Sequence, residues 1–498
     1  MDEKIPASLL SLVAEYVTEQ MGLDFPDKRR QDLERGLAGA ALELGIESVE
    51  AYARSIVSAT VTDEQIQTLA SRLTVGETYF FRDAPSFEIL EKQILPELIA
   101  ERVREQRRLR IWSAGCCTGE EPYSIAILLA KLIPNLRDWR ITILGTDING
   151  AALRHASAGA YRSWSFRDTP LPIRNRYFTQ IENGMWQVNP EIRKLVSFSF
   201  LNLAKDRYPS LETNTNCMDI LLCRNVLMYF QSEKVPPVID RLDRALAPNG
   251  WLFVSPSEAA HTLFSQFKIA NFPNAIVFRK QEETKPPAPP VTQFVSAPPT
   301  AEVVAKAEAY QPKVAIPTAP NGAGIFEQAH ELFMKGLHAK AEETLLRIVD
   351  CAADPRACTL MTRIFANQGR LGEALEWSGK AIAIDKLNPD YRYLQATVLD
   401  EIGETEAAIR ALRHTLYLDA NHILAHFTLG NLLNRVGKDE VSEVHYRNAL
   451  MLLEKSDEDF ALPDSDGLTV RQLTAAIRAK RQQQNRRNSR MRVSGKGK

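Results

Sequence analysis

The chain has 498 residues, of which 45% are hydrophobic and 25% are charged, as in folded globular proteins. Its formal net charge is -1, from 61 basic and 62 acidic residues, which argues against a nucleic-acid binder with a strongly basic surface. At roughly 150 residues per domain, this length suggests about three domains.

The sequence contains no run of about 20 apolar residues, so we expect no membrane insertion. Residues 1–4 do not open a secretory signal, because no basic segment followed by an apolar one is present. The six cysteines lack C-x2-C spacing, and the eight histidines lack an H-E-x-x-H pattern. We therefore predict a cytoplasmic protein without a metal site.

Residues 1–75 carry apolar side chains at helical spacing, in two sets. The sets are Leu9, Leu12, Val13 and Tyr16, and Leu33, Leu37 and Leu44. Further along, Thr62–Gln65 precedes an apolar run and resembles a helix start. This part is predicted to be a helical N-terminal domain.

Within a predicted domain over residues 76–280, residues 108–280 alternate short apolar runs with helical patterns, which predicts an α/β fold with a doubly wound, mostly parallel sheet. The predicted strands are Arg110–Ala114, Ile141–Gly145, Val196–Phe200, Asp219–Cys223 and Trp251–Val254, with Ala275–Arg279 as a final edge strand; the helical patterns are Pro122–Leu132 and Glu233–Leu246. Residues 160–195 interrupt the alternation and are predicted to be a small β insertion with a hairpin turn at Asn183-Gly184.

Residues 281–322 hold nine of the 27 prolines and are predicted to be an extended linker, because such a segment buries too little apolar surface to fold. Residues 323–456 then repeat a glycine, at Gly336, Gly369, Gly403 and Gly437, with spacings of 33, 34 and 34 residues. Small residues follow each glycine at the same distance. This period predicts an all-α solenoid of tetratricopeptide (TPR) repeats, which bind a protein or peptide partner.

Residues 457–498 are predicted to form a capping helix and a basic tail. Acidic residues are absent after Asp466, while lysines and arginines continue to the end. We favour a solvated tail, and contact with an acidic partner is the alternative.

The first predicted strand leads through Gly115–Pro122 into an apolar helix. Glycines let a backbone approach a ligand closely beside a helix N-terminus. The loop is not G-x-G-x-x-G, and Glu120 and Glu121 stand where the pyrophosphate of a dinucleotide would lie. Negative charge there favours a cationic ligand, so we predict S-adenosylmethionine (SAM) rather than NAD. The alternative is that both glutamates only cap the helix.

Asp147 ends the second predicted strand, where an acidic side chain can accept hydrogen bonds from ribose hydroxyls. The alternative role for Asp147 is the N-cap of the helix that follows. Cys116 and Cys117 are interpreted as packed thiols, because no cysteine–histidine arrangement supports a nucleophile.

Three segments resemble the CheR chemoreceptor methyltransferases: Thr78–Asp83 (TYFFRD), Thr118–Ser124 (TGEEPYS) and Cys223–Phe230 (CRNVLMYF). They occur in this order, and the resemblance covers about residues 5–280. It implies a SAM-dependent enzyme that converts glutamate side chains of receptor cytoplasmic domains into γ-glutamyl methyl esters. The implied fold has a helical N-terminal domain, a SAM-binding α/β domain and a β-subdomain inserted in the latter.

The resemblance also implies roles for individual residues. Thr78 and Arg82 would contact the cofactor from the helical side. Glu121, with Glu120 as a second candidate, would face its amino acid end, and Asp147 would face its ribose. Asn202 and Leu203 would border its adenine, and Arg224 and Asn225 would close the site. Family members often carry Asn at position 76; Gly76 here leaves only a backbone contact. Arg82 and Tyr229 would be the catalytic residues.

The chemistry of the implied reaction suits these two residues. A glutamate has a reference pKa near 4.3, so at neutral pH it is already a carboxylate nucleophile and needs no strong base. The enzyme must instead supply positioning in a dry site. Arg82 can hold a carboxylate in its fork, and Tyr229 can orient a group by a hydrogen bond.

The whole architecture resembles CheR–TPR fusions of chemosensory systems that control surface behaviour and biofilm formation, such as the WspC type. Three alternatives stay open: a methyltransferase of a small molecule, a TPR scaffold with an inactive methyltransferase domain, and a dinucleotide oxidoreductase. Intact Arg82, Asp147, Asn225 and Tyr229 count against the scaffold.

Overall fold

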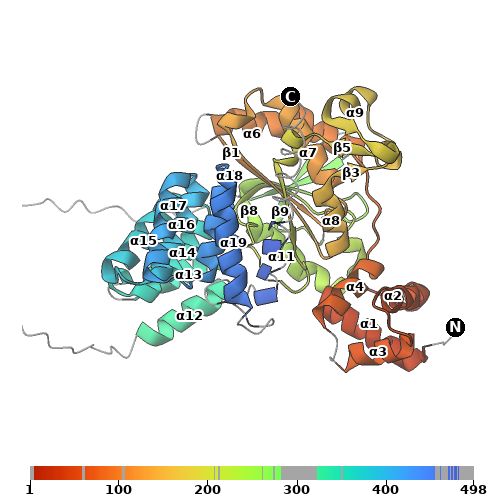
Figure 1. Cartoon of the computed structure of the whole chain (residues 1–498), viewed down its shortest axis with the longest axis horizontal. Helices are drawn as coiled ribbons and strands as arrows, with labels where there is room; N and C mark the ends of the chain where they lie inside the picture. The colour runs from red at the N-terminus through yellow and green to blue at the C-terminus, as the bar shows by residue number, and fades with distance from the viewer. Residues whose placement is uncertain are drawn as a thin grey trace, which may run out of the picture.

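The computed structural model (Figure 1) describes residues 5–58, 62–103, 107–206, 208–210, 213–260, 262–272, 275–281, 322–348 and 351–454, together with single residues and short runs between 460 and 481. The predicted linker, apart from its first and last residue, and the end of the basic tail lie outside the described residues. No helix among the described residues is long and apolar enough to cross a membrane.

Four helices form the N-terminal part, α1 (Ala7–Met21), α2 (Arg30–Glu43), α3 (Val49–Val57) and α4 (Asp63–Leu73). They bury a common core that includes Val13, Leu33 and Leu37, as the helical spacing predicts, but Leu12 of the first predicted set lies outside it and is 47% exposed. The expected helix start is confirmed, since the side chain of Thr62 accepts from the backbone N–H of Gln65 and the Gln65 side chain accepts from the N–H of Thr62.

The central sheet has seven strands in the order β6-β2-β1-β7-β8-β10-β9. The first five are parallel, and β10 is antiparallel to both of its neighbours. The strands are β1 (Arg108–Ala114), β2 (Arg140–Asp147), β6 (Val196–Phe200), β7 (Met218–Leu222), β8 (Leu246–Phe253), β9 (Phe267–Phe272) and β10 (Ala275–Lys280). The doubly wound sheet is therefore confirmed.

One strand prediction was wrong about position. Residues 275–280 form a strand, but β9 covers its outer side and is the edge strand. The strand β9 was not predicted, because Lys268 is exposed and most other residues of the strand are only partly buried. Its sequence therefore has no clear apolar run.

Helices cover both faces of this sheet. The chain passes through α5 (Ala84–Ile89), a π-helical turn (Leu90–Ile94), α6 (Leu95–Val103), α7 (Glu120–Leu132), α8 (Gly150–Ala158) and α11 (Val235–Ala245). Because side chains alternate along a strand, Ile111 of β1 packs with α6 and α7, whereas Trp112 packs with α11 on the other face.

The insertion is a separate sheet of β3 (Ala160–Tyr161), β5 (Trp186–Val188) and β4 (Phe178–Gln180), with α9 (Leu171–Tyr177) and α10 (Pro190–Arg193). Residues 182–184 connect the antiparallel β4 and β5, so the predicted hairpin at Asn183-Gly184 is confirmed. Phe80 stacks among Tyr161, Phe166 and Phe178 at centroid distances of 4.8 to 4.9 Å. This cluster ties the Thr78–Asp83 segment to the insertion.

Beyond the linker, helices pair as the repeats predict. The pairs are α12 (Gly322–Met334) with α13 (His338–Leu345), α14 (Pro355–Asn367) with α15 (Leu371–Ile384), α16 (Pro389–Ile402) with α17 (Thr405–Leu418), and α18 (Ile423–Arg435) with α19 (Asp439–Leu453). Each repeat glycine has positive φ and ends the first helix of its pair. We call residues 322–454 the TPR array.

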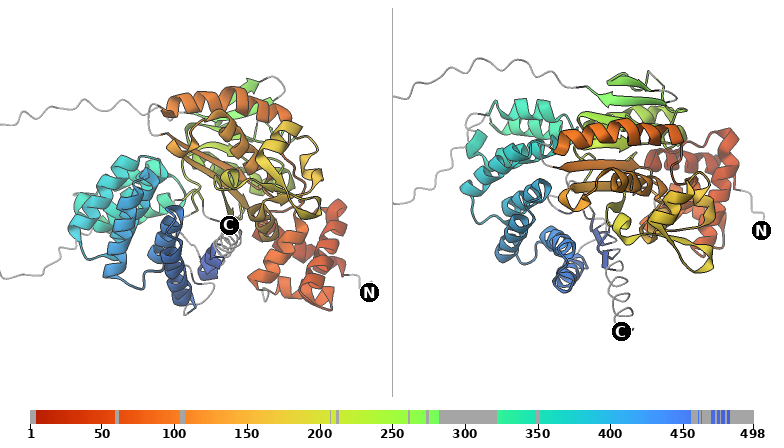
Figure 2. Two further views of the ribbon diagram at one scale, coloured as in Figure 1. Left: turned by 45° about the horizontal axis from the view of Figure 1, so that its top comes forward. Right: turned by 90° about the horizontal axis from the view of Figure 1, so that it is seen from above.

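The TPR array and the N-terminal helices lie on opposite sides of the sheet (Figures 1 and 2). The described residues near 470–481 pack on the last repeat, where Leu473 and Ile477 join its core. The capping helix stays a prediction, because only single residues and short runs are described between 460 and 481.

Candidate active site

A pocket of about 1080 Å³, part of it open to solvent, lies where the N-terminal helices meet the carboxyl ends of β1, β2, β6 and β7. Ligands of open α/β sheets bind at this edge. All ten predicted site residues line it: Gly76, Thr78, Arg82, Glu121, Asp147, Asn202, Leu203, Arg224, Asn225 and Tyr229.

The loop after β1 depends on its glycines. Gly115 and Gly119 have φ of 74° and 91°, in the left-handed region. A Cβ on Gly115 would overlap Val226, and one on Gly119 would lie 2.7 Å from the Cβ of Ala156. The backbone N–H groups of Gly115 and Cys116 both donate to the carbonyl of Thr146, at 2.7 and 2.9 Å. The loop is thus held against β2.

Glu121 and Arg224 line the pocket and form an ion pair with each other. Arg224 donates from Nη1 to Glu121 at 2.9 Å and from Nη2 to Asp83 at 3.1 Å, and the Ser113 hydroxyl donates to Glu121 at 2.7 Å. The Arg224 side chain is only 3% exposed. Its Nε is buried without a hydrogen-bond partner among the described residues, so the guanidinium keeps one donor unused.

Glu120 points elsewhere. It accepts from the hydroxyls of Thr118 and Ser165, at 2.7 and 3.0 Å, and it does not line the pocket. Burial raises the pKa of its carboxyl, and the two hydroxyls oppose this. The prediction that Glu120 would accompany Glu121 at the ligand is therefore wrong: Glu120 anchors the insertion to the glycine loop.

Asp147 ends β2 and faces the pocket. It accepts from the backbone N–H groups of Cys117 and Asn149, both at 2.8 Å. Burial raises the pKa of Asp147, and these N–H donors lower it in part. The N-cap alternative is wrong, because Asn149 caps α8 by accepting from Ala152 at 2.9 Å. A carboxylate has about four lone-pair directions, so Asp147 can accept further hydrogen bonds.

Asn202 holds the chain after β6 in place. Its amide donates to the carbonyl of Gln20 at 2.7 Å, its oxygen accepts from Ala204 at 3.0 Å, and its backbone N–H donates to Asp206 at 2.7 Å. The side chain is therefore engaged in joining α1 to this loop, and Leu203 beside it supplies apolar surface.

The two predicted catalytic residues lie at the side of the pocket near the helical domain. Arg82 is half-buried and donates to the carbonyl of Glu77 at 2.6 Å. Tyr229 accepts at its backbone carbonyl from Asp24 at 2.8 Å, and Arg29 lies over its ring at 5.7 Å. Arg82 has donors left for a carboxylate.

Glu258 is a functional residue that the sequence analysis missed. It is 6% exposed, and its carboxylate accepts from the backbone N–H groups of Asn225, Val226 and Met228, at 2.8, 2.7 and 3.1 Å. It thus orders the loop that carries Arg224 and Tyr229. Nothing near Glu258 in the sequence indicates this, because its partners lie about 30 residues earlier.

The two cysteines of the loop are poor nucleophiles. Burial raises the pKa of Cys116 well above its usual range and that of Cys117 to about 12, and nearby Asp147 adds to both shifts. Thiolates are therefore scarce at neutral pH.

The donors and acceptors fit SAM. Two carboxylates, Glu121 and Asp147, can face its ammonium and hydroxyl groups, and an apolar wall that includes Leu201 and Leu203 can face a base. The charged residues described in the lining are three arginines, Arg29, Arg82 and Arg224, and three acids, Glu77, Glu121 and Asp147, so the pocket can receive both the ammonium group and the carboxylate of SAM; Arg224 is already paired with Glu121.

Comparisons with known proteins agree with this geometry. Residues 76–276 match the "CheR methyltransferase, SAM binding domain". "Chemotaxis protein methyltransferase 1" of Pseudomonas aeruginosa is 37% identical over 211 residues, which is 42% of this chain and 74% of that protein. "Probable biofilm formation methyltransferase WspC" of the same organism is 27% identical over 371 residues, which is 74% of this chain and 82% of that protein. The chain therefore belongs to the CheR family of SAM-dependent methyltransferases.

Proposed function

We propose that this enzyme transfers the methyl group of SAM to glutamate side chains on the cytoplasmic domain of a chemoreceptor, forming γ-glutamyl methyl esters. The observation that carries the proposal is Arg82, a half-buried arginine of the pocket with spare donors, whereas Arg224 is already paired with Glu121. The relatives named chemotaxis methyltransferases support the same acceptor.

SAM supplies a methyl group on a positively charged sulfur. An acceptor glutamate is ionised at neutral pH, so this chain need not remove a proton. Arg82 holds the acceptor carboxylate in its fork, and the Tyr229 hydroxyl orients it by a hydrogen bond. The N-terminal helices cover this side of the pocket and exclude water, which sharpens positioning.

The remaining site residues bind and orient the cofactor in this proposal. Glu121 faces its ammonium group and Asp147 its ribose hydroxyls. Gly76 and Thr78, together with Arg82, contact it from the helical side, Asn202 and Leu203 border the adenine, and Arg224 and Asn225 close the pocket. The side chain of Asn202 is engaged with Gln20 and Ala204 and its backbone N–H with Asp206, so in this proposal Asn202 borders the adenine by van der Waals contact.

We propose the domain boundaries that the sequence predicts: a helical domain over 1–75, a methyltransferase domain over 76–280 with an insert at 160–195, and TPR repeats over 323–456. The repeats supply a surface for a protein or peptide partner. The acceptor, a receptor cytoplasmic domain, places the reaction in the cytoplasm.

Transfer of labelled methyl from SAM to a panel of receptor cytoplasmic fragments tests the proposal, with the product scored as base-labile methanol. We expect label on at least one receptor, and a loss of about a hundredfold or more in Arg82→Ala with SAM binding retained within tenfold. Arg347→Ala, which removes an exposed arginine of the TPR array, is the matched control and should leave the rate unchanged.

Two results would overturn the proposal. SAM binding without label on any receptor would move a small-molecule acceptor to first place. Full receptor methylation by Arg82→Ala would remove Arg82 from the catalytic step.

A further inference from the structure

The turns of the TPR array contact the methyltransferase domain at equivalent positions. A Cβ on Gly369 would overlap the sulfur of Cys217, and one on Gly403 would overlap the guanidinium of Arg140. Gly336 meets Arg244 in the same way, whereas a Cβ on Gly437 would find nothing within 4 Å. The first three repeats therefore touch the sheet domain through the turn inside each repeat, whereas no described residue lies within 4 Å of the Cβ position at the fourth turn.

The order of these contacts follows the order of the strands. Arg244 stands just before β8, Cys217 just before β7, and Arg140 begins β2, while β1 lies between β7 and β2. The turns of repeats one, two and three thus run along the sheet from β8 to β2. All contacts lie at the amino ends of the parallel strands.

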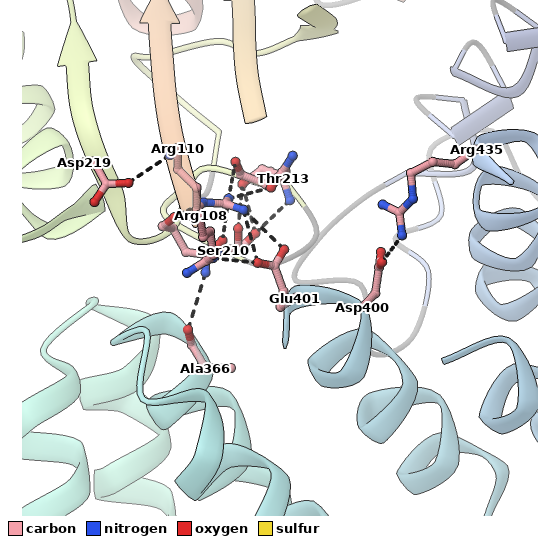
Figure 3. A network of polar contacts seen from close by, with 11 residues as sticks. Arg108, Arg110, Ser210, Thr213, Asp219, Ala366, Asp400, Glu401 and Arg435 are labelled. Carbon is pink, nitrogen blue, oxygen red and sulfur yellow. Dashed lines mark hydrogen bonds and ion pairs between the residues drawn. The ribbon is translucent and has the colours of Figure 1, made fainter. Parts of the chain in front are cut away.

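At β1 the contact between the two domains includes a buried cluster of charged side chains (Figure 3). Glu401, in the last turn of α16, pairs with Arg108 at 2.9 Å and with Arg110 at 3.1 Å. The three side chains are 17%, 16% and 3% exposed. Burial alone would raise the pKa of Glu401, but the two arginines outweigh it and the pKa is lowered. Glu401 is therefore ionised at neutral pH.

Arg110 is built into the sheet domain as well. Its Nε donates to the carbonyl of Asn216 at 3.1 Å, and its Nη2 donates to the carbonyl of Asn214 at 3.0 Å. These bonds hold the guanidinium within the sheet domain, with Nη1 facing Glu401. A preorganised donor loses little entropy when it pairs.

The ends of helices add to the charge match. The C-termini of α12, α14 and α16 all point to this edge, and a helix C-terminus carries partial negative charge. The side-chain amide of Asn216 donates to the carbonyl of Ala366, in the last turn of α14, at 3.4 Å. Arg140 and Arg244 lie against the ends of α16 and α12. The basic edge of the sheet therefore faces three negative helix ends and one carboxylate.

We propose that the TPR array docks in cis: the end of the array that carries Glu401 binds the methyltransferase domain of the same chain. The array is then a fixed part of the enzyme rather than a module on a free tether. Docking leaves the active site open, because the array contacts the amino ends of the strands and none of its described residues lines the pocket. A further partner of the array must bind another face.

The test uses the full chain with a specific protease site placed in residues 282–321. After cleavage, the affinity between the two halves is measured by dilution and analytical ultracentrifugation. We expect the wild-type halves to stay together, and Glu401→Lys to weaken the complex by about a hundredfold or more, since it removes one partner of a buried ion pair and adds a like charge. Glu406→Lys is the matched control, because Glu406 is exposed on the next helix.

A second pair of variants keeps the test independent of charge. Gly369 and Gly437 have φ of 74° and 79°, so alanine strains both turns alike. Gly369→Ala should weaken the complex by tenfold or more, and Gly437→Ala should not change it. Reversing the charges, with Glu401→Arg and Arg108→Glu together, should recover part of the affinity lost in Glu401→Arg alone.

Separation of the wild-type halves at micromolar concentration would overturn the proposal. So would equal affinities for Glu401→Lys and Glu406→Lys. Circular dichroism of each variant distinguishes loss of docking from loss of the helical fold, and the glycine pair decides the matter if Glu401→Lys unfolds.

Discussion

Single buried carboxylates organise the active site of this methyltransferase. Asp147 accepts hydrogen bonds from the backbone N–H groups of Cys117 and Asn149, and Glu258 accepts them from backbone N–H groups of the loop after β7. A backbone N–H bonded to an ionised acceptor is held more firmly than one bonded to a neutral acceptor. The loops that carry the proposed cofactor ligands are thus fixed before any ligand arrives.

Glu258→Gln should disturb the site without touching the ligand. The new amide nitrogen must face backbone N–H donors, which leaves at least one buried donor unpaired and costs about 1 to 3 kcal/mol of unfolding free energy. We expect a lower melting temperature and about tenfold weaker SAM binding, measured by calorimetry. Glu233→Gln, an exposed site that bonds only Ser232 among the contacts described, serves as the control. Unchanged affinity in Glu258→Gln would mean that the loop is ordered by other contacts.

At the scale of elements, the predictable parts are those in which local pattern and tertiary role agree. The start of α4 at Thr62 and the positions of the repeat glycines depend on the local backbone conformation, so they could be predicted from the sequence. The edge strand β9 and the role of Glu258 did not follow. The strand is only half-buried, and the contacts of Glu258 join residues far apart in the chain. Grouping of the ten site residues in one pocket was reached through the motif resemblance, not through spacing alone.

Two histidines of the last repeat give this element a pH response. His426 and His445 approach at 3.0 Å between their Nδ1 atoms, and Nε2 of His426 lies 3.0 Å from the carbonyl of Ala420. Burial, together with His426, lowers the pKa of His445 from 6.5 to about 4. In the unfolded chain His445 is protonated below about pH 6.5. In the folded protein it is protonated only at about pH 4 and below, because its pKa is lowered.

Stability of the TPR array should therefore fall as the pH drops from 6.5 toward 4. Thermal unfolding followed by circular dichroism measures this, and His445→Gln should flatten the dependence in that window. His414→Gln, at an exposed position, should keep the wild-type slope. An unchanged slope in His445→Gln would show that the histidine pair is not responsible.

At the scale of the whole molecule, the active site depends on contact between the N-terminal helices and the sheet domain. Leu23 pairs with Phe230 as an isolated bridge, and Gln231 donates from its backbone N–H to the carbonyl of Gly22 at 2.9 Å. Gly22 has a φ of 74°, and a Cβ there would lie 2.7 Å from the Phe230 ring. The end of α1 and the loop that carries Tyr229 are thus held together at Gly22.

Gly22→Ala should loosen this contact and weaken SAM binding about tenfold, because the added methyl group forces Phe230 to move. Gly45 is the matched control, with a φ of 69° and nothing within 4 Å of its would-be Cβ. Gly45→Ala carries only the backbone strain, about 1 kcal/mol, and should bind SAM like the wild type. Equal affinities of the two variants would contradict a role for the Gly22 contact.

In the proposed reaction the acceptor is a glutamate carboxylate of a receptor. Peptide mass spectrometry of a receptor cytoplasmic fragment, after incubation with the full chain and SAM, identifies the methylated residue. We expect methyl groups on glutamate side chains, lost on mild base treatment and absent when Arg82→Ala replaces the wild-type enzyme. A base-stable methyl group on another residue type, or methyl transfer only to small molecules, would contradict it.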